Sequence, residues 1–211
     1  MSIDISRIFL TNVSTGKPVE GELWDQITEK QLGDWEAEWQ PAVTEALKRL
    51  NHAGVGRPNW PQSRHWDWRQ KMKAIQGLLA YPGVSVMCEG VTQGLMIVNT
   101  SSCRCRIPAQ AGRELVYVEF LENAPWNRKE LLLQPRFRGI GSILVGTAIQ
   151  LSLAEGFKGR IGLHSLPQAN PWYANTCGMT DLGIDTDKQG LRYFEMTSAQ
   201  AEAFFAKGSQ P

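Results

Sequence analysis

Two glycines, one residue apart in the stretch Arg136–Gly141, stand directly before an apolar run from Ser142 to Leu151. Glycines at the mouth of a helix let the backbone turn tightly and aim several N–H groups at one point, where the positive end of the helix dipole adds to them. Arg136 and Arg138 can add charge-assisted hydrogen bonds. The pattern is typical of a phosphate or pyrophosphate site, and its alternative interpretation is a tight loop before a core helix.

Beyond Glu114 at its start, the strand-like segment 114–122 contains two further carboxylates. Glu119 interrupts an apolar run between Val118 and Phe120, and a carboxylate on a mostly buried strand needs a partner or a function. Glu122 lies on the opposite face by strand alternation unless a bulge intervenes. We expect Glu119, and Glu122 second, to be general-base candidates. The alternative for Glu119 is an ion pair with an arginine of a neighbouring strand.

One histidine also stands where it could do chemistry. His164 and Ser165 end the strand-like segment 160–165, so His164 is an alternative base, although no acid stands at the spacing of a Ser-His-Asp triad. Cys103 and Cys105 would share one face of a strand, but no second Cys or His pair stands nearby at zinc-ligand spacing. The sequence therefore predicts no metal site.

The totals exclude several classes of protein. The chain has 211 residues and a formal net charge of +1, which gives no bulk electrostatic argument for nucleic acid or a membrane surface. No apolar run approaches the ~20 residues of a membrane span, and the start lacks a basic segment followed by a long apolar core. We expect a soluble, cytoplasmic protein. A weaker alternative is nucleic-acid binding through four cations among tryptophans: Arg57, Arg64, Arg69 and Lys71.

The positioning elements begin with a strand at 5–10 and a turn at 12–18. A helix is predicted from Thr28, because Thr28 and Gln31 have capping-box spacing. Pro41 either kinks this helix or opens a new one.

A Pro- and Gly-rich loop at 54–61 follows, and Ser63 is the expected cap of a second helix that reaches Leu79. Six of the eight tryptophans lie in this first third and either fill a core or line a substrate pocket. They are Trp24, Trp35, Trp39, Trp60, Trp66 and Trp68.

From Val84 the apolar period becomes that of strands. A hairpin is predicted from 84–88 and 93–99 across Glu89-Gly90, and 103–107 is either a short strand or a loop. The strand 114–122 breaks at 123–127. The further expected elements are a strand-like segment at 131–134, a helix to about 155, a strand at 160–165, a short helix at 167–176, strands at 182–185 and 191–196, and a helix from 199 to 207 capped by Ser198.

This order of elements resembles the GCN5-related N-acetyltransferase family. Arg136–Gly141 matches that family's acyl-CoA signature: arginine or glutamine, two residues, glycine, one residue, glycine or alanine. Ala169 and Tyr173 match its alanine-to-tyrosine spacing, and 177–179 stands where the family has leucine-glycine-phenylalanine. The segment 117–128 is similar to the fourth strand of some members. The resemblance covers about residues 84 to 196.

The resemblance implies an α/β (α+β) fold, with a mixed, mostly antiparallel central sheet flanked by helices and a Trp-rich helical N-terminal third. It implies that acetyl-CoA is the co-substrate and that Tyr173 is the acid that protonates the leaving thiolate. The backbone of Leu121 and Asn123 would pair with the pantetheine amides. The pyrophosphate would be bound by Arg136, Arg138, Gly139, Ile140, Gly141 and Ser142.

Three departures from the family pattern stand in this sequence. Leu166 replaces a frequent asparagine, the spacing from Tyr173 to Gly178 is one residue longer, and extra chain is inserted between Pro125 and Pro135. The first two motivate the alternative to an enzyme, which is a non-catalytic acyl-CoA-binding or sensor module of the same fold.

We expect a single domain over 1–211. It would comprise an N-terminal acceptor side at 1–82, an acyl-CoA-binding core at 83–197, and a C-terminal helix and tail at 198–211. The predicted function is an acyl-CoA-dependent N-acetyltransferase whose partners are acetyl-CoA and an amine-bearing acceptor. A homodimer is kept as an option. The sequence does not name the acceptor.

Overall fold

The computed structural model describes residues 3–132 and 134–208. Its contacts divide the chain into two compact units: the first is Met1–Met96 with Leu121–Leu144, and the second is Ile97–Phe120 with Val145–Pro211. Strands β4 (Val91–Asn99) and β5 (Val116–Asn123) each contribute residues to both units. The expectation of a single domain stays a prediction.

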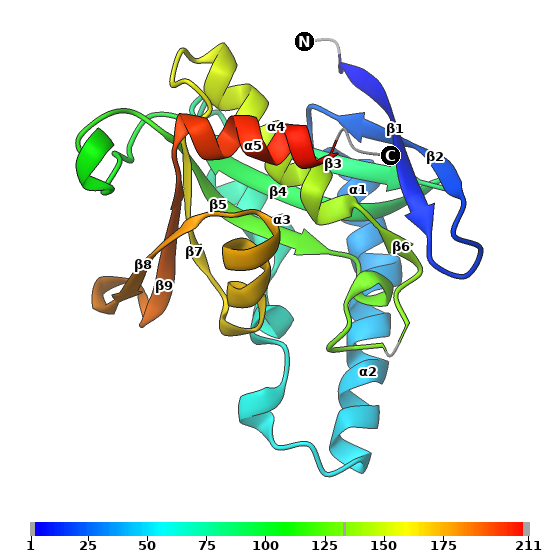
Figure 1. The fold of residues 1–211 in the computed structure, drawn as a ribbon. Coiled ribbons are helices and arrows are strands. Elements are labelled where there is room, and N and C mark those ends of the chain that lie inside the picture. Colours follow the sequence, from blue (N-terminus) through cyan, green and yellow to red (C-terminus); the bar gives the residue numbers. More distant parts are fainter. Residues whose placement is uncertain (1–2, 133, 209–211) are drawn as a thin grey trace. The chain divides into compact units, whose positions relative to one another are not determined.

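Strands of the described chain pair in the order β6-β1-β2-β3-β4-β5-β7-β9-β8 (Figure 1). Strands β5 and β7 are parallel, whereas the pairs β1–β2, β2–β3, β7–β9 and β8–β9 are antiparallel. This mixed, mostly antiparallel sheet with its helices confirms the predicted fold class. The other strands are β1 (Ile5–Asn12), β2 (Pro18–Trp24), β3 (Gly83–Cys88), β6 (Phe137–Arg138), β7 (Ile161–Ser165), β8 (Thr180–Asp185) and β9 (Leu191–Met196).

In the first unit, the predicted hairpin is confirmed as β3 and β4. Its turn residues Glu89 and Gly90 have φ of 52° and 75°, the left-handed values that two-residue hairpin turns require. Strand β2 follows the predicted first strand and turn but has no prediction of its own, because Gly21 interrupts its short alternation of Val19 and Leu23 with glutamates. Its Gly21 lies so close to β3 that an added Cβ would be 2.6 Å from the Met87 carbonyl oxygen.

The first helical segment comprises α1 (Glu29–Asp34), a π-helical turn (Trp35–Trp39) and α2 (Gln40–His52). The capping box of Thr28 and Gln31 is present, as predicted. Two alternatives were open for Pro41, a kink or a new helix, and in the structure the helical segment continues through it. The wide π turn ends at Trp39, two residues before Pro41, a residue with no N–H to donate.

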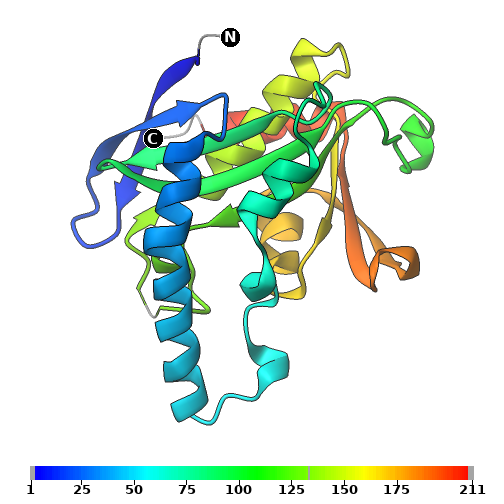
Figure 2. The same cartoon turned by 180° about the vertical axis from the view of Figure 1, so that it is seen from behind.

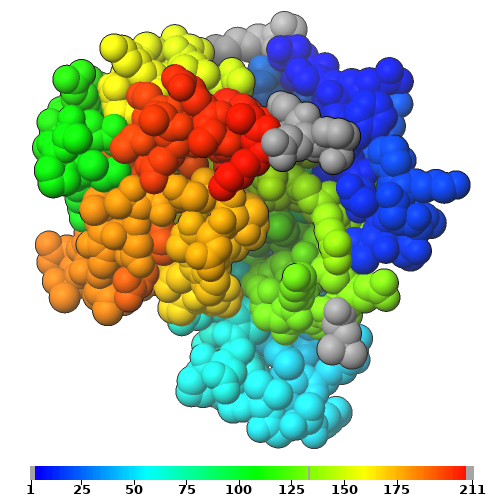
Figure 3. Space-filling model, in the orientation of Figure 1, coloured from blue at the N-terminus to red at the C-terminus, as the bar shows by residue number. Residues whose placement is uncertain are grey.

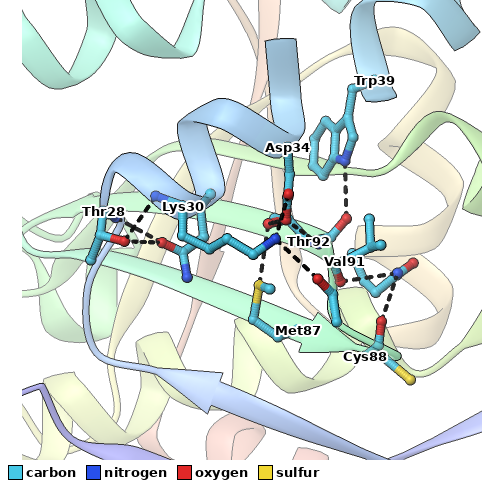
Figure 4. Close-up of polar contacts among 11 residues, drawn as sticks. Thr28, Lys30, Asp34, Trp39, Met87, Cys88, Val91 and Thr92 are labelled. Atoms are coloured by element: carbon cyan, nitrogen blue, oxygen red, sulfur yellow. Dashed lines mark hydrogen bonds and ion pairs between the residues drawn. The ribbon is translucent and has the colours of Figure 1, made fainter. Parts of the chain in front are cut away.

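Three side-chain contacts fasten this helix to β4, which it crosses in Figure 2. The Asp34 carboxylate accepts from the Thr92 backbone N–H (2.9 Å) and hydroxyl (2.7 Å), and the Trp39 indole N–H donates to the Thr92 carbonyl (3.0 Å; Figure 4). Lys30 bonds both Asp34 and the Gly90 carbonyl. Trp39 is 1% exposed, so at this position a tryptophan fills core.

The predicted cap of the second helix is wrong. Helix α3 (Trp68–Ala74) is shorter than expected and is capped by Asp67, whose side chain accepts from the Gln70 N–H. Ser63 lies in a preceding 3-10 turn, where its hydroxyl accepts from Arg128 instead. Because Ser63 lies inside this 3-10 turn and its hydroxyl bonds Arg128, the helix begins after the next acceptor, Asp67.

In the second unit, the predicted strands at 160–165, 182–185 and 191–196 are confirmed as β7, β8 and β9. Helix α5 (Ser198–Gly208) begins at the expected place, but its cap is Thr197, whose hydroxyl accepts from the Gln200 N–H. In Figure 3, α5 (red) lies beside the end of α4 (Ile140–Ala154; yellow), and a Cβ on Gly146 would be 3.5 Å from Phe205. Segment 103–107 is a loop with a single bridge, Arg104 to Glu114.

The strand-like segment 131–134 is a wrong prediction for its described residues, which form turns and bends, and Leu133 lies outside them. The strand near this place is the two-residue β6, which pairs with β1. Among residues 3–132 and 134–208, no helix combines the length and apolar character that crossing a membrane needs.

Candidate functional site

The glycine turn leads from β6 into α4 within the first unit. Gly139 has φ +102°, a backbone conformation that side chains other than glycine rarely adopt. The first helical hydrogen bond runs from the Ile143 N–H to the Gly139 carbonyl (2.9 Å). The amides of Ile140, Gly141 and Ser142 precede that bond and have no partner within the helix, as at any helix start. The turn therefore presents consecutive N–H groups at the positive end of a 15-residue helix.

A close contact with β4 holds this helix end in place. A Cβ added to Gly94 would lie 2.5 Å from Ile140 Cγ2 and 3.1 Å from Leu144 Cδ1, so the first turn of α4 packs directly on the β4 backbone. Ile140 is 2% exposed. The amides that follow Gly139 are thus fixed relative to the strand beneath them.

The two arginines of the motif differ in their surroundings. Arg136 forms an ion pair with Glu89, and its guanidinium lies 5.1 Å from the centre of the Phe137 ring. Arg138 is exposed, and within the described residues its side chain makes no hydrogen bond or ion pair. Of the two predicted contacts to a phosphate, Arg138 is therefore the one with an uncommitted charge.

The predicted pantetheine segment is the end of β5. Leu121 is half-buried, and the side-chain oxygen of Asn123 is buried without a hydrogen-bond partner. Beyond it, the Ala124 N–H donates to the Gln93 carbonyl (2.9 Å) before Pro125 ends the ladder. A buried amide oxygen without a donor is costly, so Asn123 is suited to accept from a ligand N–H.

The extra chain after Pro125 is tied back to β4 and β6. The Gln93 side-chain oxygen accepts from the Trp126 indole (2.8 Å) and from the Asn127 amide (2.9 Å). The Asn127 oxygen in turn accepts from the Phe137 N–H (2.9 Å). The insertion therefore helps to place the strand that leads into the glycine turn.

Glu122 lies in a buried ionic cluster of the first unit. One carboxylate oxygen accepts from the Trp68 indole (2.7 Å) and the other from Arg128 (2.9 Å), which also bonds Ser63 and Glu130. Glu122 is 8% exposed. Burial raises the pKa of its carboxyl group, and Arg128 opposes this. Each of the two carboxylate oxygens of Glu122 thus accepts a hydrogen bond from a buried side chain.

Glu119 lies in the second unit and is half-buried. One of its oxygens accepts from the Asn99 side-chain amide at 3.1 Å. Its partner on the neighbouring strand is thus an amide rather than the arginine that the alternative interpretation expected. Glu119 retains capacity to accept a proton or a hydrogen bond.

Tyr173 lies in a π-helical turn (Trp172–Thr176) of the second unit. This wide turn absorbs the residue by which the spacing to Gly178 exceeds the family pattern, because a single π turn inserts one residue into a helix. The tyrosine ring contacts Trp172 and Phe194, and burial raises the pKa of its hydroxyl. The buried side-chain oxygen of the nearby Asn170 has no hydrogen-bond partner.

A hydrogen-bonded chain from Tyr117 through His164 to Asp185 was not predicted from the sequence. The Tyr117 hydroxyl lies 2.6 Å from His164 Nδ1, and His164 Nε2 lies 3.0 Å from Asp185 Oδ2. Arg106 donates to the same Asp185 oxygen at 2.6 Å. Hydrogen bonds from Arg106 and His164 lower the pKa of Asp185 to about 2, while burial lowers the pKa of His164.

A buried carboxylate fastens the loop that covers this chain. Glu195 is 0% exposed. It accepts from the backbone N–H groups of Arg106 (2.5 Å) and Ile107 (3.0 Å), the Gln110 amide (2.8 Å) and the Tyr193 hydroxyl (3.2 Å). Three donors from the loop thus hold it on β9, and the fourth comes from β9 itself.

The sequence-predicted site residues fall into two groups. The first unit contains the glycine turn, Arg136, Arg138, the end of β5 and Glu122. The second unit contains Glu119, Tyr173 and His164. The sequence offers one signal for the hydrogen-bonded chain of Tyr117, His164 and Asp185. Tyr117 stands two residues before Glu119, so strand alternation places both on one face of β5.

The solved structures that resemble this chain include the following three. One is a yellow fever mosquito protein described as an insect arylalkylamine N-acetyltransferase 7, with 13% identity, 93% of this chain and 95% of that chain covered, and a TM-score of 0.51. Mycobacterium smegmatis RimJ in complex with CoA-disulfide has 14% identity, coverage of 97% and 95%, and a TM-score of 0.50. An uncharacterized Bacillus halodurans protein has 10% identity, coverage of 95% for both chains, and a TM-score of 0.50.

At these identities the likeness concerns the fold. No protein-family model matches the sequence, and no curated protein sequence matches it significantly. The chain therefore has a fold found among N-acetyltransferases.

Proposed function

We propose that this protein is an acyl-CoA-dependent N-acetyltransferase, which moves the acetyl group of acetyl-CoA to an amine. The observation that carries the proposal is the glycine turn: Gly139 at φ +102° opens a helix whose first amides are held by the Gly94 contact. Helix starts of this kind bind phosphate groups. The fold shared with the mosquito protein described as an arylalkylamine N-acetyltransferase, and with RimJ in complex with CoA-disulfide, supports this interpretation.

In this proposal the amides of Gly139, Ile140, Gly141 and Ser142 bind the pyrophosphate of acetyl-CoA. Arg138 adds a charge-assisted hydrogen bond, while Arg136 stays paired with Glu89 and contributes less. The backbone of Leu121 and Asn123, and the unpaired Asn123 oxygen, take the amides of the pantetheine arm.

The reaction converts an ammonium and a thioester into an amide, a thiol and one proton. An alkyl ammonium has a pKa of about 10.4, so it must lose a proton before its nitrogen can attack. Glu119 takes this base role, because it is half-buried and keeps accepting capacity. Tyr173 is the proposed acid for the departing thiolate. Glu122 is assigned to hold β5 against Trp68 and Arg128 rather than to exchange protons.

Calorimetry with acetyl-CoA tests the binding half of the proposal. We expect saturable binding that weakens when Arg138 is replaced by alanine, with Arg113→Ala as a control at an exposed arginine outside the motif. No heat and no shift of the melting temperature at millimolar acetyl-CoA would refute the proposal.

A thiol-release assay with DTNB over an amine library tests turnover. Cys103 is the partly exposed member of the four free cysteines and can react with the same reagent, so a protein-only blank is required. We expect acetyl-CoA-dependent thiol release with at least one amine.

A non-catalytic acyl-CoA sensor of the same fold is the second candidate function. The burial of Tyr173, which raises the pKa of the proposed acid, favours it. Binding of acetyl-CoA without thiol release from any amine would support the sensor over the enzyme.

A further inference from the structure

Three side chains from three strands of the second unit form one hydrogen-bonded chain: Tyr117 of β5, His164 of β7 and Asp185 of β8. The parallel pairing of β5 and β7 places Tyr117 opposite Gly162, two residues before His164. A side chain on Gly162 would collide with the Tyr193 hydroxyl, since an added Cβ would lie 2.5 Å from it. The glycine therefore leaves room for the two tyrosines beside the imidazole.

The partners of His164 fix the direction of its two hydrogen bonds. Asp185 is a carboxylate held by Arg106, so it only accepts, and His164 Nε2 must carry the hydrogen. In the neutral ring, Nδ1 then has a free lone pair and accepts from the Tyr117 hydroxyl. The Tyr117 oxygen keeps its own lone pairs for a further donor. A proton that arrives at Tyr117 can therefore be passed to His164.

Acetylation of an ammonium removes two protons from nitrogen, one before the attack and one from the tetrahedral adduct. Glu119 alone can take only one of them. Tyr117 and Glu119 share one face of β5 with their Cα atoms about 7 Å apart along the strand. They are close enough that, after burial, the charge of Glu119 further raises the pKa of the Tyr117 hydroxyl. A second proton acceptor thus stands beside the first.

We propose that Tyr117, His164 and Asp185 form a proton relay that takes up the second proton of the acceptor amine; the inference rests on the proposed acetyl transfer. The N–H bond of the adduct breaks and its proton forms a bond to the Tyr117 oxygen. The former hydroxyl proton moves to His164 Nδ1, which leaves an imidazolium paired with Asp185. The amide product forms as the thiolate leaves, and His164 returns the proton to solvent by the same path.

Several charged and titratable groups surround the imidazole. They come from β5, β8, β9, the loop 100–113 and the turn after β8: Tyr117, Asp185, Tyr193, Arg106 and Lys188. Cys103 lies against the two tyrosines. The relay requires neutral His164, so its contribution is present above the pKa of His164, which burial lowers, and is lost as the pH falls through that value.

The experiment compares Tyr117→Phe and His164→Asn with Tyr193→Phe. The control removes a hydroxyl from the same buried cluster, where it bonds Glu195, but leaves the relay intact. The pH profiles of kcat and KM are measured with acetyl-CoA and the library amine of highest rate. We expect kcat at pH 7 to fall about 10- to 100-fold in the two relay variants, with the acidic limb changed and the KM for acetyl-CoA kept, and about twofold or less in the control.

A second readout needs no substrate. The chain has three histidines, so nitrogen-15 NMR of histidine-labelled protein resolves His164 by comparison with His164→Asn. We expect hydrogen on Nε2 and a bare Nδ1, with the Nδ1 signal moved by Tyr117→Phe and kept by Tyr193→Phe.

The outcomes separate the relay from the transferase. Turnover with an unchanged profile in Tyr117→Phe, or a hydrogen on Nδ1, overturns the relay and leaves the transferase standing. Absence of acetyl-CoA binding, or binding without turnover of any amine, overturns both. A loss of kcat in both relay variants with the predicted tautomer supports both.

Discussion

Two glutamates of β5, three residues apart, have opposite surroundings. Glu122 is buried, and both of its oxygens accept from committed donors, Trp68 and Arg128. Glu119 is half-buried and accepts from Asn99 at one oxygen. Both glutamates lie on the same strand, so position on the strand does not distinguish them. The number of hydrogen-bond donors does: a carboxylate whose two oxygens both have donors is structural, whereas one with a free oxygen is available for proton transfer. The same contrast separates Arg136, paired with Glu89, from Arg138.

The largest expected effect is a loss of stability when Glu122, the glutamate with donors on both oxygens, loses one of them. Arg128→Met leaves the buried Glu122 charge without its cation, and removal of one partner of a buried ion pair costs about 3–5 kcal/mol. Urea unfolding monitored by circular dichroism measures the loss. Arg113→Met serves as the control at an exposed arginine. A cost below about 1 kcal/mol, the range of surface pairs, would show that Glu122 is not held as described.

The next largest effect concerns Glu119, the glutamate that can still accept a proton. We expect Glu119→Gln to lower kcat about a hundredfold, since the amide cannot take the ammonium proton, and to leave acetyl-CoA affinity and the unfolding midpoint close to those of the native chain. Steady-state kinetics and calorimetry measure the two parts. A large loss of stability with unchanged kcat would reverse the roles assigned to the two glutamates.

The arginine pair gives a smaller effect. We expect Arg138→Ala to weaken acetyl-CoA binding about tenfold, because it removes a charge-assisted hydrogen bond to phosphate. Arg136→Ala is the matched variant and should change the affinity less, because its guanidinium is already paired with Glu89. Calorimetric Kd values compare them. Equal losses would mean that the Glu89 pair opens when the ligand binds.

The smallest effect is a pH dependence. The pKa of Asp185 is lowered to about 2 by hydrogen bonds from Arg106 and His164, whereas an unfolded aspartate has a pKa of about 3.9. The stabilisation by this carboxylate is therefore complete above about pH 4 and is lost as the pH falls toward 2. We expect the stability difference between the native chain and Asp185→Asn to shrink over that interval in urea titrations. A constant difference would contradict the pairing.

Elements with local signals were predictable from the sequence. The β3–β4 hairpin follows from Glu89-Gly90, whose residues adopt the left-handed backbone of a tight turn, and the helix start at Thr28 follows from its capping box. Strand β6 has two residues and a partner strand far away in the sequence, so it leaves no periodic pattern. The cap at Ser63 failed because a tertiary partner, Arg128, bonds its hydroxyl.

The candidate site divides in the same way. The glycine turn is a local motif, and its backbone conformation follows from Gly139 itself. The relay is not local, since Tyr117, His164 and Asp185 meet only through the pairing of β5, β7, β9 and β8. No spacing along the chain encodes that juxtaposition, and so the sequence could offer His164 as a base without naming its partners.

The loop whose backbone donates hydrogen bonds to Glu195 constrains any engineering of this protein. From 103 to 113 it contains a single 3-10 turn (Pro108–Gln110) and looks like a replaceable connection. Its backbone nevertheless supplies two of the four donors to a carboxylate with 0% exposure. A shortened or grafted loop would leave that carboxylate in the interior without these hydrogen bonds. In the native protein we therefore expect the Arg106 and Ile107 amides to exchange with deuterium as slowly as those of a core strand.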